Sequence, residues 1–354
     1  MSLLKINSLN ISFRTTNNPV KVVSGLNFEI EEAEVFGLVG ESGCGKSLTA
    51  LSIMGILPHN AFAEGEVVFK GSDLLKLDRE SMRRLRGKEL SMIFQEPMTS
   101  LNPVLTIGYQ VAEVLTTHMG LSKKEAMDNT IELLRAVKIP SPEIRIKEYP
   151  HQMSGGMRQR VMIAMAIACN PALLIADEPT TALDVTIQAQ ILELIQKLRE
   201  ERKMAVLLIT HDLGIIAENV KRVAIMYAGR LMEMTDTDEL FNNPRHPYTI
   251  GLLESLPKEK GIPLKPIPGF VPKPDELPQG CKFSDRCRFA IRECMEREPE
   301  LIPVTSNESR DTPSLTLPPR GGGQGWGGDP SLVTRHSSLH LVRCVRAEEI
   351  TWHS

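Results

Sequence analysis

The chain has 354 residues, enough for one domain of ordinary size and a smaller second one. Its 41 Lys and Arg nearly balance its 44 Asp and Glu, and no basic stripe or aromatic platform is present, which argues against nucleic acid as the main partner. Its longest apolar runs, at 161–168 and 205–209, fall far short of the roughly 20 residues that span a bilayer, and no signal-peptide pattern is present. We expect a cytosolic protein, in which the 6 cysteines indicate metal ligation or chance rather than structural disulfides.

The N-terminal region has the pattern of an antiparallel sheet. Residues 1–35 alternate between apolar and polar positions on both sides of a polar turn at 15–19, with Phe13 just before the turn. Residues 61–70 predict a further strand, and residues 78–87 are typical of a charged, exposed helix.

A glycine loop follows the apolar segment 35–39 and precedes the apolar segment 48–51. Its sequence is Gly40-Glu41-Ser42-Gly43-Cys44-Gly45-Lys46-Ser47. Such a loop turns its backbone N–H groups inward, and the helix that follows adds positive dipole, so the sequence predicts a polyphosphate site. In this pattern Lys46 meets the β- and γ-phosphates and Ser47 meets Mg²⁺. An ordinary glycine turn is the alternative, which the strand before the loop and the helix after it disfavour.

The middle of the chain predicts a strand and a helical block. Residues 90–97 form an apolar strand that ends in a polar loop with Gln95. Residues 107–138 carry apolar side chains at helical spacing, and the segment 149–152 breaks this pattern.

A second anion-binding helix start is expected at Ser154-Gly155-Gly156, before a helix predicted at 161–169, and Ser154 is placed where a helix N-cap belongs. The continuous apolar run 172–176 predicts a buried parallel strand, which places Asp177 and Glu178 at its carboxyl end. Open α/β sheets bind ligands at that edge.

The rest of the chain continues this pattern and then changes composition. A helix to about residue 202 and a strand at 205–210, ending at His211, are followed by a hairpin at 223–234. Proline becomes frequent after residue 242, so 257–280 predicts an extended linker. The segment 281–294 is compact and charged, and 312–330 is typical of a flexible low-complexity loop.

With these motifs in this order, residues 1 to about 250 resemble the ATPase subunits of ABC transporters. The runs 94–103 and 149–160, together with Arg245-His246-Pro247-Tyr248, resemble the peptide/nickel importer branch. The resemblance implies an α/β fold: an ABC-type P-loop ATPase domain with a mixed sheet core, an antiparallel β subdomain and a helical subdomain. It also implies a small irregular C-terminal extension that bears cysteines. We therefore expect an ATPase domain at 1–250, a Pro-rich linker at 251–280 and the extension at 281–354.

The resemblance also implies roles in binding MgATP. Phe13 would stack on adenine, although a lone Phe near a strand end is usually core. The phosphates would be held by Gly40, Ser42, Gly43, Cys44, Gly45, Lys46, Ser47 and Thr49. Ser47, Gln95 and Asp177 would hold Mg²⁺.

Three further roles concern catalysis, and in the first of them Gln95 would touch the metal or the attacking water. Glu178 would polarise the attacking water, since the strand end places it beside the metal, while solvated carboxylates are the alternative for both acids. His211 would contact the γ-phosphate, although a histidine alone is more often structural. Ser154, Gly155 and Gly156 would close over ATP held by an opposite subunit. Cys44 and Cys169 are typical small fillers, but an adduct on Cys44 would collide with the nucleotide.

These roles predict a subunit that energises membrane import of short peptides. Its partners would be a second ATPase subunit in a heterodimer, two permeases contacted through Gln95 and the loop 96–102, and an extracytoplasmic binding protein. The protein would be located at the cytoplasmic face of the membrane.

The alternatives concern cargo and function class. Nickel or a glycoside is the alternative cargo. A soluble ABC protein of translation or DNA repair would usually carry two cassettes or a coiled-coil insertion, and a P-loop GTPase or kinase would lack the Ser-Gly-Gly helix start.

Four cysteines near the C-terminus, Cys281, Cys287, Cys294 and Cys344, predict a [4Fe–4S] cluster. Structural zinc typically uses tighter C-x₂-C pairs, and a cytosolic location disfavours disulfides. The resemblance adds support, because some importer ATPases hold clusters in such extensions. Unligated thiols are the alternative, and the Gly-rich insertion before Cys344 departs from a compact pattern. We expect the cluster to lie away from ATP and to be a structural or redox element.

Overall fold

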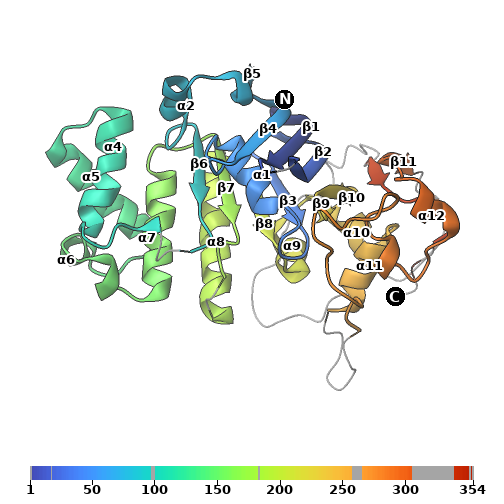
Figure 1. Cartoon of the computed structure of the whole chain (residues 1–354). Coiled ribbons are helices and arrows are strands. Elements are labelled where there is room, and N and C mark those ends of the chain that lie inside the picture. The colour runs from blue at the N-terminus through green and yellow to red at the C-terminus, as the bar shows by residue number, and fades with distance from the viewer. Residues whose placement is uncertain are drawn as a thin grey trace. The chain divides into compact units, whose positions relative to one another are not determined.

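The chain divides into two compact units in a computed structural model that describes residues 2–16, 18–96, 100–181, 184–256, 265–304, 339–350 and 352 (Figure 1). Unit 1 comprises Met1–Lys221, Met226–Leu231 and Phe270–Leu277, and unit 2 comprises Arg222–Ile225, Met232–Gly269 and Pro278–Ser354. The sequence-based boundaries at 250 and 280 remain predictions. The expected low-complexity loop 312–330 and part of the expected linker, 257–264, lie outside the described residues.

Unit 1 begins with the predicted antiparallel sheet. Its strands have the order β2-β1-β4-β5 and are β1 (Ser2–Phe13), β2 (Val20–Glu31), β4 (Ala61–Phe69) and β5 (Ser72–Asp73). The apolar positions of β1 that recur along the strand, such as Leu4 and Ile6, are at most 1% exposed. Burial of one face explains the alternating pattern of the sequence.

The parallel part of a second, mixed sheet positions the nucleotide motifs. Four of its strands are adjacent in the order β3-β8-β7-β6: β3 (Val35–Val39), β8 (Ala205–Thr210), β7 (Leu173–Asp177) and β6 (Leu90–Ile93). Val39 pairs with Thr210, and Asp177 pairs with Ile209. Since parallel strands end at the same edge, the segments that follow β3, β6, β7 and β8 meet there, as the sequence predicted.

Helices complete unit 1. α4 (Ile107–Met119), α5 (Lys123–Ala136), α6 (Pro142–Arg145) and α7 (Gly155–Ile167) gather on the side away from β1 and β2 (Figure 1). The predicted block 107–138 is two helices, because Gly120 caps α4 in the left-handed conformation and Ser122 opens α5 with a capping box. The remaining helices are α1 (Lys46–Ile53), α2 (Arg79–Leu85), α8 (Val185–Arg202) and α9 (Leu213–Asn219).

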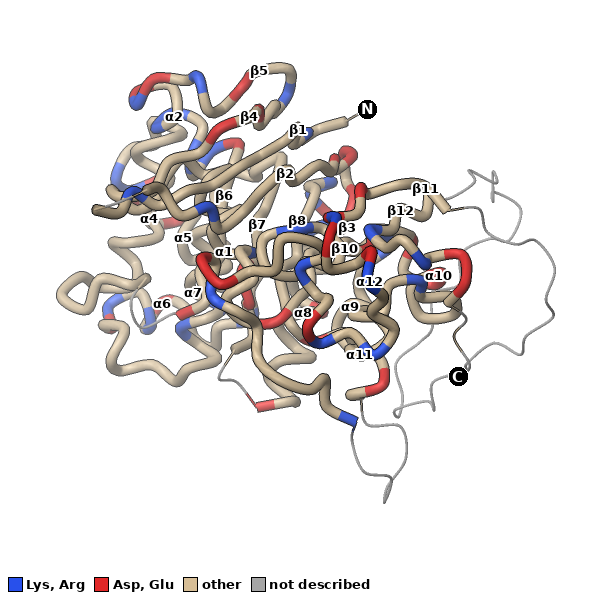
Figure 2. Tube along the Cα trace, turned by 45° about the vertical axis from the view of Figure 1, so that its right-hand side comes forward, with Lys and Arg blue, Asp and Glu red and all other residues tan. Residues whose placement is uncertain are grey.

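Both signs of charge are spread along the described trace, as expected from the near balance of basic and acidic residues in the composition. Lysine and arginine alternate with aspartate and glutamate, for example on α2 (Figure 2). None of the helices in the described part of the chain is both long and apolar enough to span a bilayer.

Unit 2 contains residues from β9 (Arg222–Tyr227) and β10 (Arg230–Asp236), then α10 (Thr237–Asn242), α11 (Pro247–Glu254) and α12 (Arg292–Glu296). The short strands β11 (Ile302–Val304) and β12 (His340–Val342) are antiparallel, and β12 also pairs with β10 through Glu233 and Met234. The chain that carries Cys344 is therefore attached to unit 2 by strand pairing.

A buried carboxylate in unit 2, that of Glu233, contacts the β12 strand that precedes Cys344. Glu233 is 0% exposed and accepts hydrogen bonds from the backbone N–H groups of Arg245 (2.7 Å) and His246 (3.0 Å). His340 Nε2 lies 2.6 Å from Glu233 Oε1, and His340 Nδ1 lies 3.5 Å from Glu239 Oε1. Burial lowers the pKa of His340, but hydrogen bonds to the two carboxylates outweigh it and raise the pKa to about 9.

Stability is therefore expected to fall between pH 6.5, the ordinary pKa of histidine, and about pH 9. In this window the folded chain keeps a proton on His340 that the unfolded chain has lost. Through this residue the free energy of unfolding therefore falls by about 1.4 kcal/mol per pH unit. Its contribution is full below pH 6.5 and is lost as pH rises through about 9. Urea unfolding measured across this range should show a shallower slope for His340→Gln. An equal slope in both proteins would contradict the assignment.

Candidate nucleotide site and cysteine cavity

The glycine loop between β3 and α1 has a shape that only glycine allows at several positions. Gly43 and Gly45 have φ of 80° and 106°, in the left-handed region. A Cβ atom at Gly40 would lie 2.1 Å from the Met226 carbonyl oxygen. The loop therefore brings backbone N–H groups to the N-terminus of α1, an arrangement that suits a polyphosphate.

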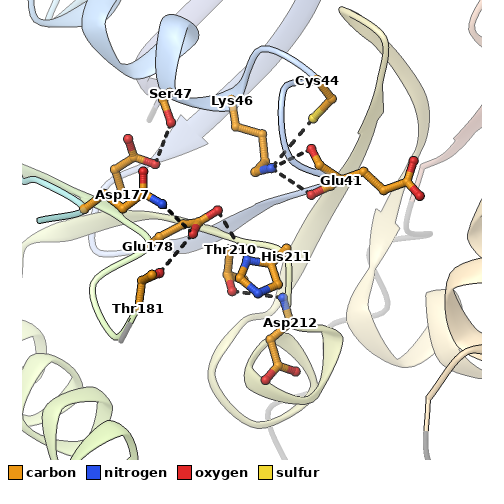
Figure 3. Close-up of polar contacts among 12 residues, drawn as sticks. Glu41, Cys44, Lys46, Ser47, Asp177, Glu178, Thr181, Thr210, His211 and Asp212 are labelled. Atoms are coloured by element: carbon orange, nitrogen blue, oxygen red, sulfur yellow. Dashed lines mark hydrogen bonds and ion pairs between the residues drawn. The ribbon is translucent and has the colours of Figure 1, made fainter. Parts of the chain in front are cut away.

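Lys46 is held inside this loop. It is 4% exposed, and its Nζ donates hydrogen bonds to the carbonyl oxygens of Gly40 (2.7 Å) and Glu41 (3.0 Å) (Figure 3). Thr49 is 0% exposed and donates its hydroxyl to the Gly45 carbonyl at 3.0 Å, so it braces the loop from the helix side. A cation fixed in a glycine loop can neutralise phosphate charge, the main requirement of phosphoryl transfer.

Cys44 points inward rather than toward solvent. It is 0% exposed, and its Sγ lies 3.8 Å from Lys46 Nζ. Burial raises the pKa of its thiol, more than the nearby Lys46 lowers it. This environment favours the alternative of a shielded filler.

We expect Cys44 to react with iodoacetamide far more slowly in the folded chain than after unfolding in urea, because it is buried and its thiolate is scarce. Mass spectrometry of the peptide that contains Cys44 measures this, with half-buried Cys169 as the internal comparison. Rapid modification of Cys44 in the folded chain with ATP binding intact would contradict both the shielding and the predicted collision.

A hydroxyl and a carboxylate meet where Mg²⁺ is expected. Ser47 Oγ donates to Asp177 Oδ1 at 3.2 Å (Figure 3). Asp177 is 4% exposed, and burial is the main cause that raises its pKa. These are hard oxygen ligands of the type that Mg²⁺ prefers, so the pair fits the ion chemically.

Glu178 is the centre of a second cluster. Its Oε2 accepts hydrogen bonds from Gln95 Nε2 (3.0 Å) and Thr181 Oγ1 (2.9 Å), and His211 Nδ1 lies 3.3 Å from its Oε1 (Figure 3). Glu178 has a φ of 46°, which is strained for this residue type and fixes the direction of its side chain. The structure thus brings together three predicted residues and adds Thr181, which the motifs did not single out.

The other predicted binding residues lie on different elements. Ser154 is the exposed N-cap of α7, and its Oγ accepts from Met157 N–H at 3.3 Å, with Gly155 and Gly156 in the first turn. This confirms the predicted cap, although α7 begins at Gly155, earlier than the apolar run suggested. Phe13 is half-buried at the end of β1, opposite Val20 and Ala61. The contribution of these residues to nucleotide binding stays a prediction.

Cys281, Cys287, Cys294 and Cys344 line one cavity in unit 2. Cys281 N–H donates to the Cys294 carbonyl at 2.7 Å, which joins two of the cysteine segments. Burial raises the pKa of Cys281 to about 11 and that of Cys344 to about 12, and the neighbouring cysteines add to both shifts.

The cavity does not have the geometry of a site for a single ion. Among the described residues, no group of three or more His, Cys, Asp or Glu side chains could hold a metal ion. The predicted cluster is therefore not confirmed. Four cysteines that line one cavity are nevertheless the ligand type of an iron–sulfur group, whose thiolates bind different irons.

Comparisons with known proteins agree with the nucleotide motifs. Residues 23–181 match the family described as ABC transporter, and residues 232–294 match the family described as oligopeptide/dipeptide transporter, C-terminal region. A probable peptide ABC transporter ATP-binding protein of Sinorhizobium fredii is 51% identical over 85% of this chain and 92% of its own length. The dipeptide transport ATP-binding protein DppD of Haemophilus influenzae is 48% identical over 87% of this chain and 94% of its own length.

A solved structure shows the same fold. The ATP-binding cassette MJ0796, a dimer in a post-hydrolysis state bound to ADP and Pi, matches with a TM-score of 0.59 and 27% identity over 66% of this chain and 98% of that chain. The predicted fold class is thus confirmed. The chain belongs to the ATP-binding proteins of ABC transporters, in the oligopeptide/dipeptide branch, and is an ABC ATPase.

Proposed function

We propose that this ATPase energises the import of short peptides through a membrane transporter. The observation that carries the proposal is the meeting of Gln95, Glu178 and His211 beside the Ser47–Asp177 pair, at the edge of the parallel sheet. The peptide-transport names of its relatives and the match of residues 232–294 support the cargo class. Import of nickel or another solute by the same machinery is the alternative, and competition for uptake between labelled dipeptide and unlabelled solutes distinguishes them.

In this proposal each residue has a role in hydrolysis. The glycine loop and Lys46 bind the phosphates, and Ser47, Asp177 and Gln95 hold Mg²⁺, which supplies charge neutralisation when bound. Glu178 accepts a proton from the attacking water through a carboxylate oxygen. His211 contacts the γ-phosphate, and Thr181 keeps the Glu178 carboxylate oriented through its hydrogen bond to Oε2.

We further propose that hydrolysis needs a second ATPase subunit. Ser154, Gly155 and Gly156 form a helix start with an exposed N-cap, Ser154, which suits anion binding across a dimer. The solved relative in this fold is a dimer. The assembly would include two permeases and, through them, an extracytoplasmic binding protein, and it would place this chain at the cytoplasmic face of the membrane.

The permease contact is expected at Gln95 and the loop 96–102. Glu96 and Asn102 are exposed at the two ends of this loop, so a photo-crosslinker at either position should capture a membrane permease. The same group at Lys76, whose side chain is 73% exposed but lies outside the loop, is the matched control. Repeated capture of ribosomal protein or DNA from the loop would favour a soluble ABC function instead.

The cysteine cavity is proposed to hold a [4Fe–4S] cluster through Cys281, Cys287, Cys294 and Cys344. Support comes from their shared lining of one cavity and from the mutual electrostatic effect of the four thiols. Because burial raises the pKa of the Cys281, Cys287 and Cys344 thiols, cluster insertion would release protons as the thiolates form. The cluster would supply a rigid link between the segment 281–294 and Cys344, or a redox centre.

A further inference from the structure

His246 lines the same cavity as the four cysteines but has no part in the proposed ligation. It is 1% exposed and is the N-cap residue of α11. The ring is therefore a buried polar group in the same cavity lining as the cysteines, and its orientation decides which hydrogen bonds it can make there.

Two hydrogen bonds and one ring contact fix that orientation. The backbone N–H of His246 donates to Glu233 Oε2 at 3.0 Å. The ring Nδ1 accepts the backbone N–H of Tyr248 at 3.0 Å, and the ring lies 6.1 Å from that of Phe283, between centroids. Because Nδ1 uses its lone pair as an acceptor, the neutral ring carries its proton on Nε2.

This Nε2–H group is a buried donor without a hydrogen-bond partner among the described residues. The Arg343 backbone carbonyl is near enough to favour the protonated ring, but it does not meet Nε2 in hydrogen-bonding geometry. Buried donors are almost always satisfied in folded proteins, so an acceptor is expected in the cavity.

We propose that His246 Nε2–H donates a hydrogen bond to a sulfur of the iron–sulfur group held by the four cysteines, and so raises its reduction potential. The inference rests on the proposed cluster. A cysteine thiolate or an inorganic sulfide is an anionic acceptor, which strengthens the bond. Reduction adds negative charge to the sulfurs, so the donor stabilises the reduced form more than the oxidised form, and hydrogen bonds to sulfur are known determinants of cluster potential.

Two substitutions separate this role from helix capping. His246→Asn keeps an acceptor near the position of Nδ1 for the Tyr248 N–H but removes the Nε2–H donor. His246→Gln places an amide N–H near the position of Nε2 but gives up the cap. Both full-length variants and the wild type would be purified anaerobically, assayed for iron and sulfide, and titrated with dithionite.

We expect all three proteins to hold iron and sulfide, with the potential of His246→Asn lower by about 59 mV, a tenfold change in the ratio of reduced to oxidised cluster. His246→Gln should stay near the wild-type potential and lose thermal stability. In the reduced wild type, an exchangeable-proton hyperfine coupling should be present, and it should vanish in the Asn variant.

The outcomes distinguish the two proposals. A loaded His246→Asn protein with wild-type potential and an unchanged exchangeable coupling would overturn the hydrogen bond and leave the cluster standing. A wild-type protein without iron and sulfide would overturn the cluster and this inference together.

Discussion

Glu178→Gln is expected to bind ATP like the wild type and to hydrolyse it about 10³-fold more slowly, since a general base contributes that order of magnitude. The amide keeps the shape of the side chain, and its oxygen can still accept from Thr181, but it cannot take a proton from water. Lys46→Ala should lose ATP binding as well, because it removes the ammonium that the glycine loop holds. Nucleotide affinity and phosphate release separate the two effects.

Glu200→Gln is the matched control, because it makes the same chemical change on the exposed part of α8. It should hydrolyse ATP at the wild-type rate. Near-normal turnover in Glu178→Gln would refute the assigned role of this residue and leave the hydrogen bonds around it without a catalytic purpose.

The second large effect is expected in unit 2. Wild-type protein purified without oxygen should contain about four iron and four sulfide per chain, and Cys281→Ser should lose most of both, because a buried serine hydroxyl is a poor substitute for a thiolate. Cys344→Ser tests the ligand that follows the long insertion. Cys169→Ser, in unit 1 and outside the cavity, should keep the full iron content.

Two results would contradict the cluster. One is a colourless wild-type protein with stoichiometric zinc, which would mean that the thiols converge on a single ion after all. The other is a metal-free wild-type protein with four titratable thiols in unit 2, which would support the alternative of unligated cysteines.

The candidate nucleotide site at the carboxyl edge of the parallel strands could be predicted from sequence, because each of its motifs is a short, continuous stretch of the chain. The apolar runs that became β3, β7 and β8 indicated strands, and the run of β7 indicated a buried parallel strand with Asp177 and Glu178 at its end. Parallel pairing then brings these ends together whatever the loops do. The bond between Ser47 and Asp177, 130 positions apart, follows from this topology.

Contacts that depend on side-chain direction could not be predicted in the same way. Thr181 lies three residues after Glu178 and donates to its carboxylate, and the positive φ of Glu178 is not indicated by any sequence pattern. The start of α7 was placed too late because glycine weakens a helical pattern, while the Ser154 cap compensates. A threonine three residues after an acid is the signal that could have found the Thr181 contact.

The side-chain contacts of unit 2 could be predicted from sequence even less. His340 and Glu233 are 107 positions apart, and no periodicity links them. The motif that contains His246 was noted as a family resemblance without a role. Only the fold places its ring beside the four cysteines and gives Nδ1 to Tyr248, which leaves Nε2 as the donor.

Peptide uptake tests the central claim most directly. Cells that lack this chain but keep its transporter partners would be supplied with the wild type or with Glu178→Gln, and accumulation of a labelled dipeptide would be measured. We predict that the wild type restores uptake and that Glu178→Gln, present at the same level, does not. Equal uptake with both proteins, or none with either while the wild type hydrolyses ATP normally, would contradict ATP-driven peptide import by this chain.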